Sequence, residues 1–194
     1  FWYDLPESLI AQTPMEPRDH SRLMHLSTPS GQIDHLHFFD LLDLLHPGDC
    51  LIVNDSRVLP ARLYGEKQTG ARIELLLLEQ KRADVWEVLV KPGKKALPGV
   101  SIFFGILRAD VLEVLDGGNR LVRFFYEGNF FDILEKIGQM PLPHYITAEL
   151  KDNERYQTVY SHELGFAAAP TAGLHFTREL LDQIQAMGVS LCYV

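Results

Sequence analysis

The chain has 194 residues, of which 46% are hydrophobic, and it carries a formal net charge of −8. This is enough apolar material for one large domain or two small ones. The acidic balance argues against a protein that coats nucleic acid nonspecifically, and no apolar run approaches the ~20 residues that a membrane-spanning helix needs.

The first part of the chain mixes helical and strand patterns. Leu5 has a proline next to it, which a helix tolerates in its first turn, and a Thr-Pro-Ser-Gly run at 28–31 is typical of a hairpin turn. The expected elements are, in chain order, a helix at 5–12, strands at 22–27 and 32–38 that form a hairpin, a short helix at 40–45 and a buried apolar strand at 50–54.

The middle of the chain predicts only strands. Turn-forming Gly, Pro, Asn and Asp separate short apolar runs, and the run Phe103–Leu107 leaves room for only an abrupt turn. The expected strands are 62–66, 72–78, 85–90, 100–104, 107–115 and 120–126. Six short strands without a helix between them predict a closed or nearly closed β-barrel.

Helical patterning returns at 129–137, where Gly138 ends the helix, and helix and strand patterns then alternate to Val194. The predicted fold class is therefore α/β (α+β mixed). We expect residues 1–60 and 145–194 to form one α/β domain, with an antiparallel β-barrel domain at 61–144 inserted between them.

The most distinctive stretch is Ala169–Thr177, a run of small, turn-forming residues that contains His175. Thr177 is a suitable N-cap for a helix at 178–187, and Gly188 stands where a terminating glycine belongs. Small residues let the backbone approach a ligand, and a helix N-terminus offers N–H groups to a carboxylate or phosphate. The alternative is a tight loop that only joins a strand to a helix.

The compartment follows from the N-terminus and the cysteines. Asp4, Pro6 and Glu7 interrupt any apolar region of the kind a signal peptide needs. Cys50 and Cys192 form no C-x-x-C pair, so the sequence offers zinc no cysteine framework. We expect reduced thiols and a cytoplasmic protein.

Four long motifs, taken together and in this order, resemble the S-adenosylmethionine:tRNA ribosyltransferase-isomerase family of queuosine biosynthesis. The motifs are Asn54–Leu63, Met140–Ile146, Arg155–Tyr160 and Ala169–Thr177. The resemblance begins at Asp4 and runs through essentially the whole chain. The family continues beyond Val194 with a further His- and Gly-containing motif, so we expect the site to be incomplete here.

The resemblance implies a reaction and its partners. The ribosyl part of S-adenosylmethionine is transferred to 7-aminomethyl-7-deazaguanine at the wobble position of a tRNA with a GUN-type anticodon, and is isomerised. The product is epoxyqueuosine, with adenine and methionine released. S-adenosylmethionine is consumed as a substrate, so no cofactor and no metal are expected. We expect a monomer that does not bind membranes.

His175 and Asp55 are the candidate catalytic residues. Imidazole exchanges protons near neutral pH, so His175 could act as base or acid, or could be a hydrogen-bonded loop histidine. Asp55 could accept a proton, hold the ribose hydroxyls or close an Asx turn, and we favour capping or positioning.

The candidate substrate-binding residues come from the same motifs. Arginines could hold a carboxylate or phosphate, or pair with acidic neighbours. Tyr156 and Tyr145 could stack on a base, although core packing is the stronger reading for Tyr145. His144 and Phe166 depart from the family's usual Pro and small residue. The candidates are Asn54, Arg57, Arg62, Arg155, Tyr156, Gln157, Pro170, Thr171, Ala172 and Gly173.

Several lysines and arginines are candidates for contacts with tRNA phosphates. Lys91, Lys94 and Lys95 form one basic run, and Arg57, Arg62, Arg120 and Arg123 lie elsewhere. Any of them could equally be a solvated surface charge.

Two other function classes are compatible with the sequence. A non-catalytic RNA-binding module would use the barrel in the manner of an OB-fold, with a basic and aromatic stripe and no pocket at 169–177. A metal-dependent hydrolase would use His35, His37 and His175.

Overall fold

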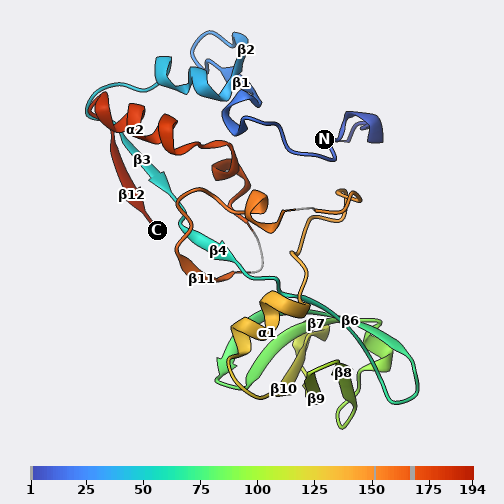
Figure 1. Ribbon diagram of the computed structural model, residues 1–194. Coiled ribbons are helices and arrows are strands. Elements are labelled where there is room, and N and C mark those ends of the chain that lie inside the picture. Colours follow the sequence, from blue (N-terminus) through green and yellow to red (C-terminus); the bar gives the residue numbers. More distant parts are fainter. Residues whose placement is uncertain (1, 151, 167–168) are drawn as a thin grey trace. The chain divides into compact units, whose positions relative to one another are not determined.

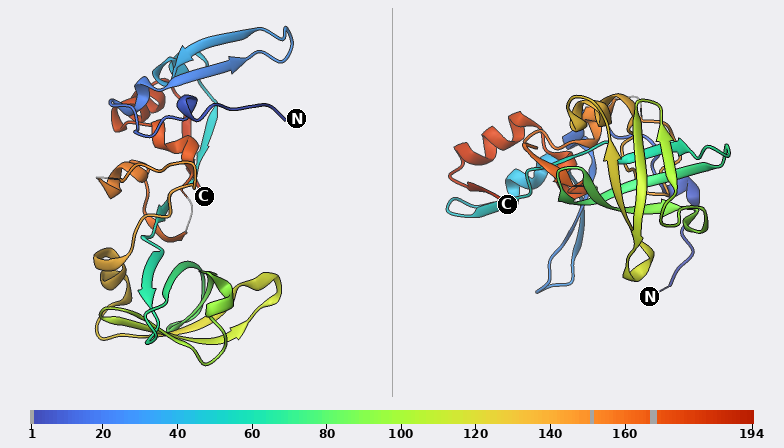
Figure 2. Two further views of the ribbon diagram at one scale, coloured as in Figure 1. Left: turned by 90° about the vertical axis from the view of Figure 1, so that its right-hand side faces the viewer. Right: turned by 90° about the horizontal axis from the view of Figure 1, so that it is seen from below.

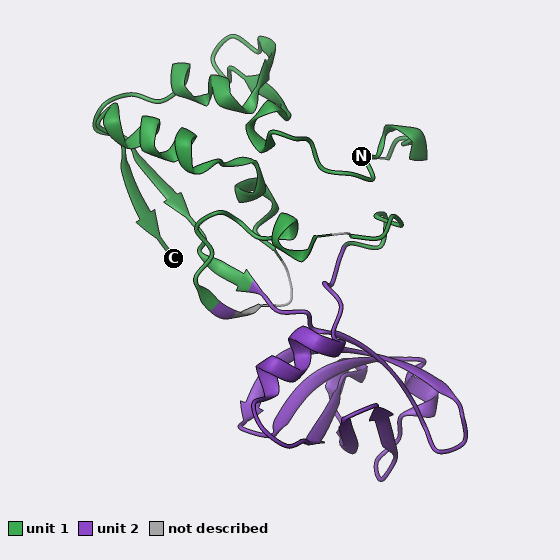
Figure 3. Ribbon diagram, viewed as in Figure 1, with its two compact units in different colours: residues 1–57, 143–163, 169–194 green, residues 58–142, 164–168 purple. Residues whose placement is uncertain are grey.

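The computed structural model describes residues 2–150, 152–166 and 169–194, apart from the side chains of residues 165 and 166 (Figure 1). The chain forms two compact units (Figure 3). The first unit comprises residues 1–57, 143–163 and 169–194, and the second unit comprises residues 58–142 and 164–168. The α/β fold with an antiparallel barrel between the chain ends is confirmed. The domain boundaries at 60/61 and 144/145 stay a prediction.

The second unit is a closed barrel of six antiparallel strands, which Figure 2 shows from two further directions. The barrel order is β10-β7-β6-β5-β8-β9, and all six expected strands are present. The strands are β5 (Arg62–Glu66), β6 (Arg72–Arg82), β7 (Val85–Lys91), β8 (Ser101–Phe104), β9 (Leu107–Val114) and β10 (Arg120–Phe125), with 3-10 helices at η4 (Gly93–Lys95) and η5 (Asp116–Gly118).

Alternating apolar side chains fill the barrel. In β5 and β6 the side chains of Leu63, Ile73, Leu75 and Leu77 are at most 1% exposed. Successive side chains of a strand point to opposite faces, so residues two apart share the interior. The period-two pattern that predicted the strands therefore also determines which face is buried.

The abrupt connection between β8 and β9 is a two-residue turn. Phe104 pairs directly with Leu107, so Gly105 and Ile106 alone make the turn. Gly105 has φ +72°, and a type II′ hairpin turn requires a positive φ at its first central position. The glycine accounts for how so short a loop reverses the chain.

The expected helix at 129–137 is α1 (Phe130–Ile137), which packs against the barrel core. The Asn129 side chain caps it by accepting hydrogen bonds from two N–H groups of the first turn. The Phe130 ring centroid lies 5.1 Å from that of Phe124 and 5.5 Å from that of Trp86. These aromatic contacts place one face of α1 in the core.

The first unit contains less regular structure. Its elements are η1 (Glu7–Leu9), η2 (Arg18–His20), β1 (Arg22–Leu26), β2 (Ile33–His37), η3 (Phe38–Asp43), β3 (Cys50–Val53), η6 (Asn153–Tyr156), η7 (Thr171–His175), α2 (Arg178–Ala186) and β12 (Ser190–Tyr193). β1 and β2 form the expected hairpin, which projects from its neighbours in Figure 2. β3 and β12 pair in parallel. The strands β4 (Ser56–Val58) and β11 (Glu163–Phe166), which contain the unit boundaries at 57/58 and 163/164, form another two-stranded sheet.

A small apolar core holds the first unit together. Helix α2 buries Leu180, Leu181 and Ile184 against Phe176 and Val189. The Thr177 side chain accepts a hydrogen bond from the N–H of Leu180, and Gly188 has φ +89°. The expected cap and terminating glycine of this helix are both confirmed.

Three expectations for the first unit are wrong in part. The expected helix at 5–12 is only the three-residue η1, none of whose residues is buried, and so short a helix is unstable without an apolar face to pack. The helix expected at 40–45 is the 3-10 helix η3, which starts at Phe38. The strand at 50–54 exists as β3, but Ile52 is 66% exposed, because β12 is its only strand partner among the described residues.

The two cysteines are neighbours in space. Cys50 on β3 and Cys192 on β12 are both exposed free thiols, and their Sγ atoms lie 3.1 Å apart. The hydrogen bond between them raises the pKa of the Cys50 thiol. The parallel pairing of strands from opposite ends of the chain brings them together.

Gly138→Ala should destabilise the second unit. The added Cβ would lie 2.0 Å from the carbonyl oxygen of Pro60 and 2.7 Å from that of Leu134. Both are backbone atoms that cannot rotate away, so we expect the free energy of unfolding to fall by about 3 kcal/mol in urea unfolding. Gly31→Ala is the control: its Cβ would meet nothing within 4 Å and its φ is +70°, so it should cost about 1 kcal/mol. Equal losses in the two variants would contradict the steric explanation.

Candidate functional site

The segment 169–177 folds as a turn of 3-10 helix followed by a capped α-helix. Pro170 precedes η7, and Thr177 is the N-cap of α2. The Thr177 hydroxyl also donates to a carboxylate oxygen of Asp19 at 3.3 Å. The chain's own groups therefore occupy part of the helix N-terminus that the sequence suggested for an anion.

A cavity of about 370 Å³ lies within the first unit, beside this segment. Small-molecule sites usually span about 300–1,000 Å³ and have mostly apolar walls with a few polar groups. Here the polar groups come from Asn54 and Tyr160. The lining residues are Phe38, Leu41, Leu51, Ile52, Val53, Asn54, Tyr160, Pro170, Ala172, Gly173 and Phe176.

Gly173 is the point of closest approach in the cavity wall. A Cβ there would lie 2.2 Å from the hydroxyl oxygen of Tyr160 and 2.9 Å from a methyl carbon of Thr158. Only glycine fits between these side chains. The glycine at this position is therefore required by close packing against the 158–160 stretch.

Tyr160 is a cavity residue that sequence reasoning did not select. Burial, and secondarily the neighbouring Tyr193, raise its pKa to about 12. Its hydroxyl, which lies beside Gly173 of the cavity wall, therefore stays protonated at neutral pH and is a hydrogen-bond donor. Its position at the end of the Arg155–Tyr160 motif is the one sequence feature that indicates a role for Tyr160 in the site.

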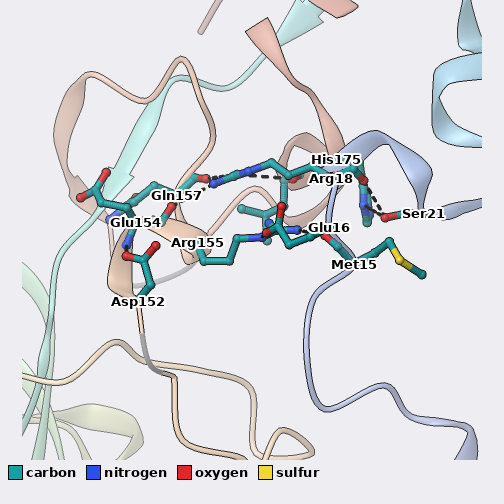
Figure 4. Close-up of polar contacts among 10 residues, drawn as sticks. Met15, Glu16, Arg18, Ser21, Asp152, Glu154, Arg155, Gln157 and His175 are labelled. Atoms are coloured by element: carbon teal, nitrogen blue, oxygen red, sulfur yellow. Dashed lines mark hydrogen bonds and ion pairs between the residues drawn. The ribbon is translucent and has the colours of Figure 1, made fainter.

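Arg18 connects the two C-terminal motifs, as Figure 4 shows. Its guanidinium donates to the main-chain carbonyl oxygens of Gln157 at 2.6 Å, Glu154 at 3.1 Å and Leu174 at 3.5 Å. Burial lowers its pKa, and so does the nearby positive charge of Arg155. Arg18 lies outside every motif, so the sequence did not indicate this role.

Arg155 and Gln157 also hold the chain in place. The Arg155 guanidinium pairs with the Glu16 carboxylate and donates to the carbonyl oxygen of Met15 at 2.6 Å. Gln157 is 4% exposed. Tyr156 is partly buried in η6. The arginine is thus engaged with the protein's own acceptors.

His175 is the last residue of η7, and its ring contacts Ser21 and Phe38 of the first unit. Its Nδ1 lies 2.8 Å from Ser21 Oγ, and its ring centroid lies 5.2 Å from that of Phe38. Burial lowers its pKa, and the charge of Arg155 lowers it further. The imidazole is therefore neutral at pH 7 and can accept a proton.

The residues of the Asn54–Leu63 motif make contacts in different parts of the structure. The Asn54 side chain accepts a hydrogen bond from the N–H of Ser56 at 2.8 Å, so Asn54 closes the Asx turn that was considered for Asp55. Asp55 is partly buried, and its carbonyl oxygen accepts from the N–H of His162 at 2.7 Å. Arg57 forms an ion pair with Glu154.

Arg62 belongs to the second unit, where its Nε lies 3.2 Å from a carboxylate oxygen of Glu74.

The expectation that Tyr145 packs in the core is wrong, because Tyr145 is 49% exposed. Thr171 and His144 are exposed. The side chain of Phe166 lies outside the described residues.

The structure thus brings together part of the expected set. Asn54, Pro170, Ala172 and Gly173 line one cavity. Gln157 and His175 lie in the polar network around Arg18. Their roles in binding or catalysis stay predictions.

The barrel's arginines are mostly engaged within the second unit. Arg123 pairs with Asp84, and Arg62 with Glu74. Arg120 is 7% exposed and donates to the carbonyl oxygens of Ala96 and Gly93, both at 2.8 Å. The exposed basic run Lys91, Lys94 and Lys95 remains available for phosphate contacts.

His35 and His37 lie on β2 and are exposed. His37 pairs with Arg22 in the hairpin register, which puts a cation beside this candidate ligand. Within residues 2–150, 152–166 and 169–194, no group of three or more His, Cys, Asp or Glu is placed to hold a metal ion. Nor is any helix in those ranges long and apolar enough to cross a membrane.

The sequence matches the family described as "Queuosine biosynthesis protein" over residues 1–194. The match covers the barrel and every motif that forms the cavity and the Arg18 network. The chain belongs to this family.

Its relatives carry a more specific name. It is 57% identical over 197 residues to the S-adenosylmethionine:tRNA ribosyltransferase-isomerase of Acetivibrio thermocellus, covering 100% of this chain and 58% of the relative. It is 55% identical over 194 residues to the protein of that name from Desulfitobacterium hafniense, covering 98% and 57%. The chain therefore spans somewhat more than half the length of these relatives.

Among solved structures, the chain is similar to an S-adenosylmethionine tRNA ribosyltransferase from Thermotoga maritima. The two are 34% identical, with a TM-score of 0.40, and the match covers 99% of this chain and 56% of the other.

The lowered pKa of His175 predicts a pH-dependent contribution to stability. As pH falls through the usual histidine pKa of 6.5, the unfolded state binds a proton before the folded state does. The contribution is therefore fully present above that pH and is lost as pH falls towards the folded pKa. In urea unfolding, the free energy of unfolding of the wild type should fall more between pH 7.5 and pH 5 than that of His175→Gln, which lacks the titrating group. A difference that moves in the wild type's favour on acidification would contradict the burial of His175.

Proposed function

We propose that this protein transfers and isomerises the ribosyl moiety of S-adenosylmethionine onto 7-aminomethyl-7-deazaguanine at the tRNA wobble position. The products would be epoxyqueuosine in the tRNA, free adenine and free methionine. The observation that carries this proposal is the family match over residues 1–194, with identities of 57% and 55% to relatives of that name.

The chemistry begins with removal of a proton on carbon next to the sulfonium. The positive sulfur stabilises the resulting carbanion, so a positioned base of ordinary strength suffices. His175 is assigned this role, because burial keeps its imidazole neutral and ready to accept a proton. The proton leaves the carbon and bonds to an imidazole nitrogen.

The donor is assigned to the cavity of about 370 Å³. Its apolar and aromatic walls suit an adenosine group, and the Tyr160 hydroxyl and Asn54 amide supply polar contacts. Gly173 and Ala172 allow the backbone to approach the ligand closely. S-adenosylmethionine is thus a substrate, and no further cofactor is invoked.

The remaining candidates are assigned to binding and positioning. Asp55 lies next to Asn54, and its carbonyl oxygen accepts from the N–H groups of His162 and Glu163. Arg57 is 29% exposed and pairs with the carboxylate of Glu154. We assign its guanidinium to a substrate carboxylate, which would replace Glu154 as its partner. Arg62, Arg155, Tyr156, Gln157, Pro170 and Thr171 complete the proposed substrate-binding set.

The tRNA partner would have a GUN-type anticodon, and its phosphates are assigned to exposed lysines of the second unit. Because the net charge is −8, binding depends on a local basic surface, and Lys91, Lys94 and Lys95 are exposed in one run. We also propose that the protein acts as a monomer in the cytoplasm.

The decisive experiment combines the purified protein, S-adenosylmethionine and tRNA that carries the aminomethyl-deazaguanine base. Nucleoside mass spectrometry would detect epoxyqueuosine, and the supernatant would be assayed for adenine. The Acetivibrio thermocellus relative serves as positive control. Binding of this tRNA without either product would favour the RNA-binding module, and methylated tRNA would overturn the donor chemistry.

His175→Ala should lower turnover by roughly 100-fold or more, because it removes the proposed base. The unfolding midpoint should change little, since the side chain is only partly buried. His46→Ala removes a histidine whose side chain is 79% exposed and should leave turnover unchanged. Near-normal turnover of a well-folded His175→Ala protein would remove His175 from the mechanism.

Lys94→Gln or Lys95→Gln should weaken tRNA binding and lower the slope of log affinity against log salt by about 1, because one phosphate contact is lost. Lys136→Gln is the matched control, since it removes the same charge from an exposed position of the second unit. Binding would be measured by filter retention over a range of salt concentrations. Equal salt slopes in the three variants would remove this lysine run from the interface.

A further inference from the structure

The hydroxyl of Ser21 lies between a main-chain carbonyl and the imidazole of His175 (Figure 4). Ser21 Oγ donates to the carbonyl oxygen of Arg18 at 2.8 Å, and His175 Nδ1 lies 2.8 Å from the same Oγ. Ser21 and His175 are 154 positions apart in the chain.

The proton positions follow from the inventory of donors. A carbonyl oxygen can only accept, and a serine hydroxyl has one proton, so that proton is committed to Arg18. The bond between Ser21 and His175 then requires Nδ1–H as donor. In a neutral imidazole with a proton on Nδ1, the lone pair is on Nε2.

We propose that Ser21 is a positioning residue that holds His175 as the Nδ1–H tautomer, so that Nε2 is the atom that accepts a proton from the substrate. This rests on the proposed function, in which His175 is the base. Ser21 would act on the substrate through His175, whose ring it holds.

The surrounding contacts fix the hydroxyl as well as the ring. The main-chain carbonyl of Ser21 accepts from the N–H of Phe38 at 2.8 Å, and the Phe38 ring packs on the His175 ring. Arg18, whose carbonyl receives the Ser21 proton, is itself held by Gln157 and Glu154. Each end of the Arg18–Ser21–His175 chain of hydrogen bonds is thereby anchored.

The neutral state of the ring supports the same assignment. Burial and the charge of Arg155 lower the pKa of His175. At neutral pH the ring therefore has one proton, and the hydrogen bond to Ser21 decides which nitrogen holds it.

The first test is independent of catalysis. Correlation NMR of ¹⁵N-labelled histidine in the intact protein at pH 7.5 distinguishes the protonated ring nitrogen of His175 from the unprotonated one. The wild type should show Nδ1–H, Ser21→Thr should keep it, and Ser21→Ala should shift the proton towards Nε2. An Nε2–H wild-type ring would overturn the proposal, whether or not the protein is active.

The second test is kinetic. Ser21→Ala should lower kcat by roughly 10- to 100-fold, a part of the contribution of a general base, without a matching rise in KM for S-adenosylmethionine, and Ser21→Thr should restore most of it. Ser101→Ala is the control, because it removes one hydroxyl hydrogen bond, to Asp110 at 2.7 Å, from a partly buried serine of the barrel. Unchanged kcat in a Ser21→Ala protein with a shifted tautomer would overturn the positioning role. An inactive wild type with an Nδ1–H ring would instead count against the proposed function.

Discussion

One positive charge, that of Arg18, determines how the candidate site is assembled. A partly buried guanidinium must have hydrogen-bond acceptors around it, because an unpaired charge away from water is costly. Arg18 obtains them from main-chain carbonyls of two segments of the chain, at Glu154 and Gln157 and at Leu174. The guanidinium is planar and its donors point in fixed directions. The three carbonyls are therefore held in one arrangement, and with them the stretches that carry Gln157, Tyr160, Gly173 and His175.

This constraint matters because the first unit has few helices and strands that could otherwise position these segments. The segments η6 and η7 are single turns of 3-10 helix, whose internal hydrogen bonds fix little beyond themselves. Side-chain contacts to the main chain take their place: Arg155 donates to Met15, and Gln12 donates to Tyr145 and accepts from Thr147. Function is often carried by such loops, provided that something rigid positions them. Here polar contacts over long sequence separations give that rigidity.

The sequence predicted the barrel well and the site only in part, for one physical reason. Strand alternation, the Asn129 and Thr177 caps and the glycine turns are local signals, so residues a few positions apart reveal them. The contacts that build the site join residues far apart: Ser21 with His175, and Arg18 with Gln157. No periodicity encodes such a pair. The motif at 169–177 could be singled out by its composition, yet its partner Tyr160 and the Asx turn at Asn54 needed the structure.

The two units also differ in what stabilises them. Among the described residues, the barrel core comprises 20 buried apolar side chains from Leu59 to Leu134, whereas the first unit's core comprises five, from Phe176 to Val189. Apolar burial contributes about 25 cal/mol per Å², so the barrel gains far more from its core. The first unit depends more on directional hydrogen bonds, whose net contributions are about 1 kcal/mol each. A ligand in the cavity beside Gly173 and Tyr160 would add apolar contacts where the core is smallest. Binding there would therefore stabilise this unit selectively.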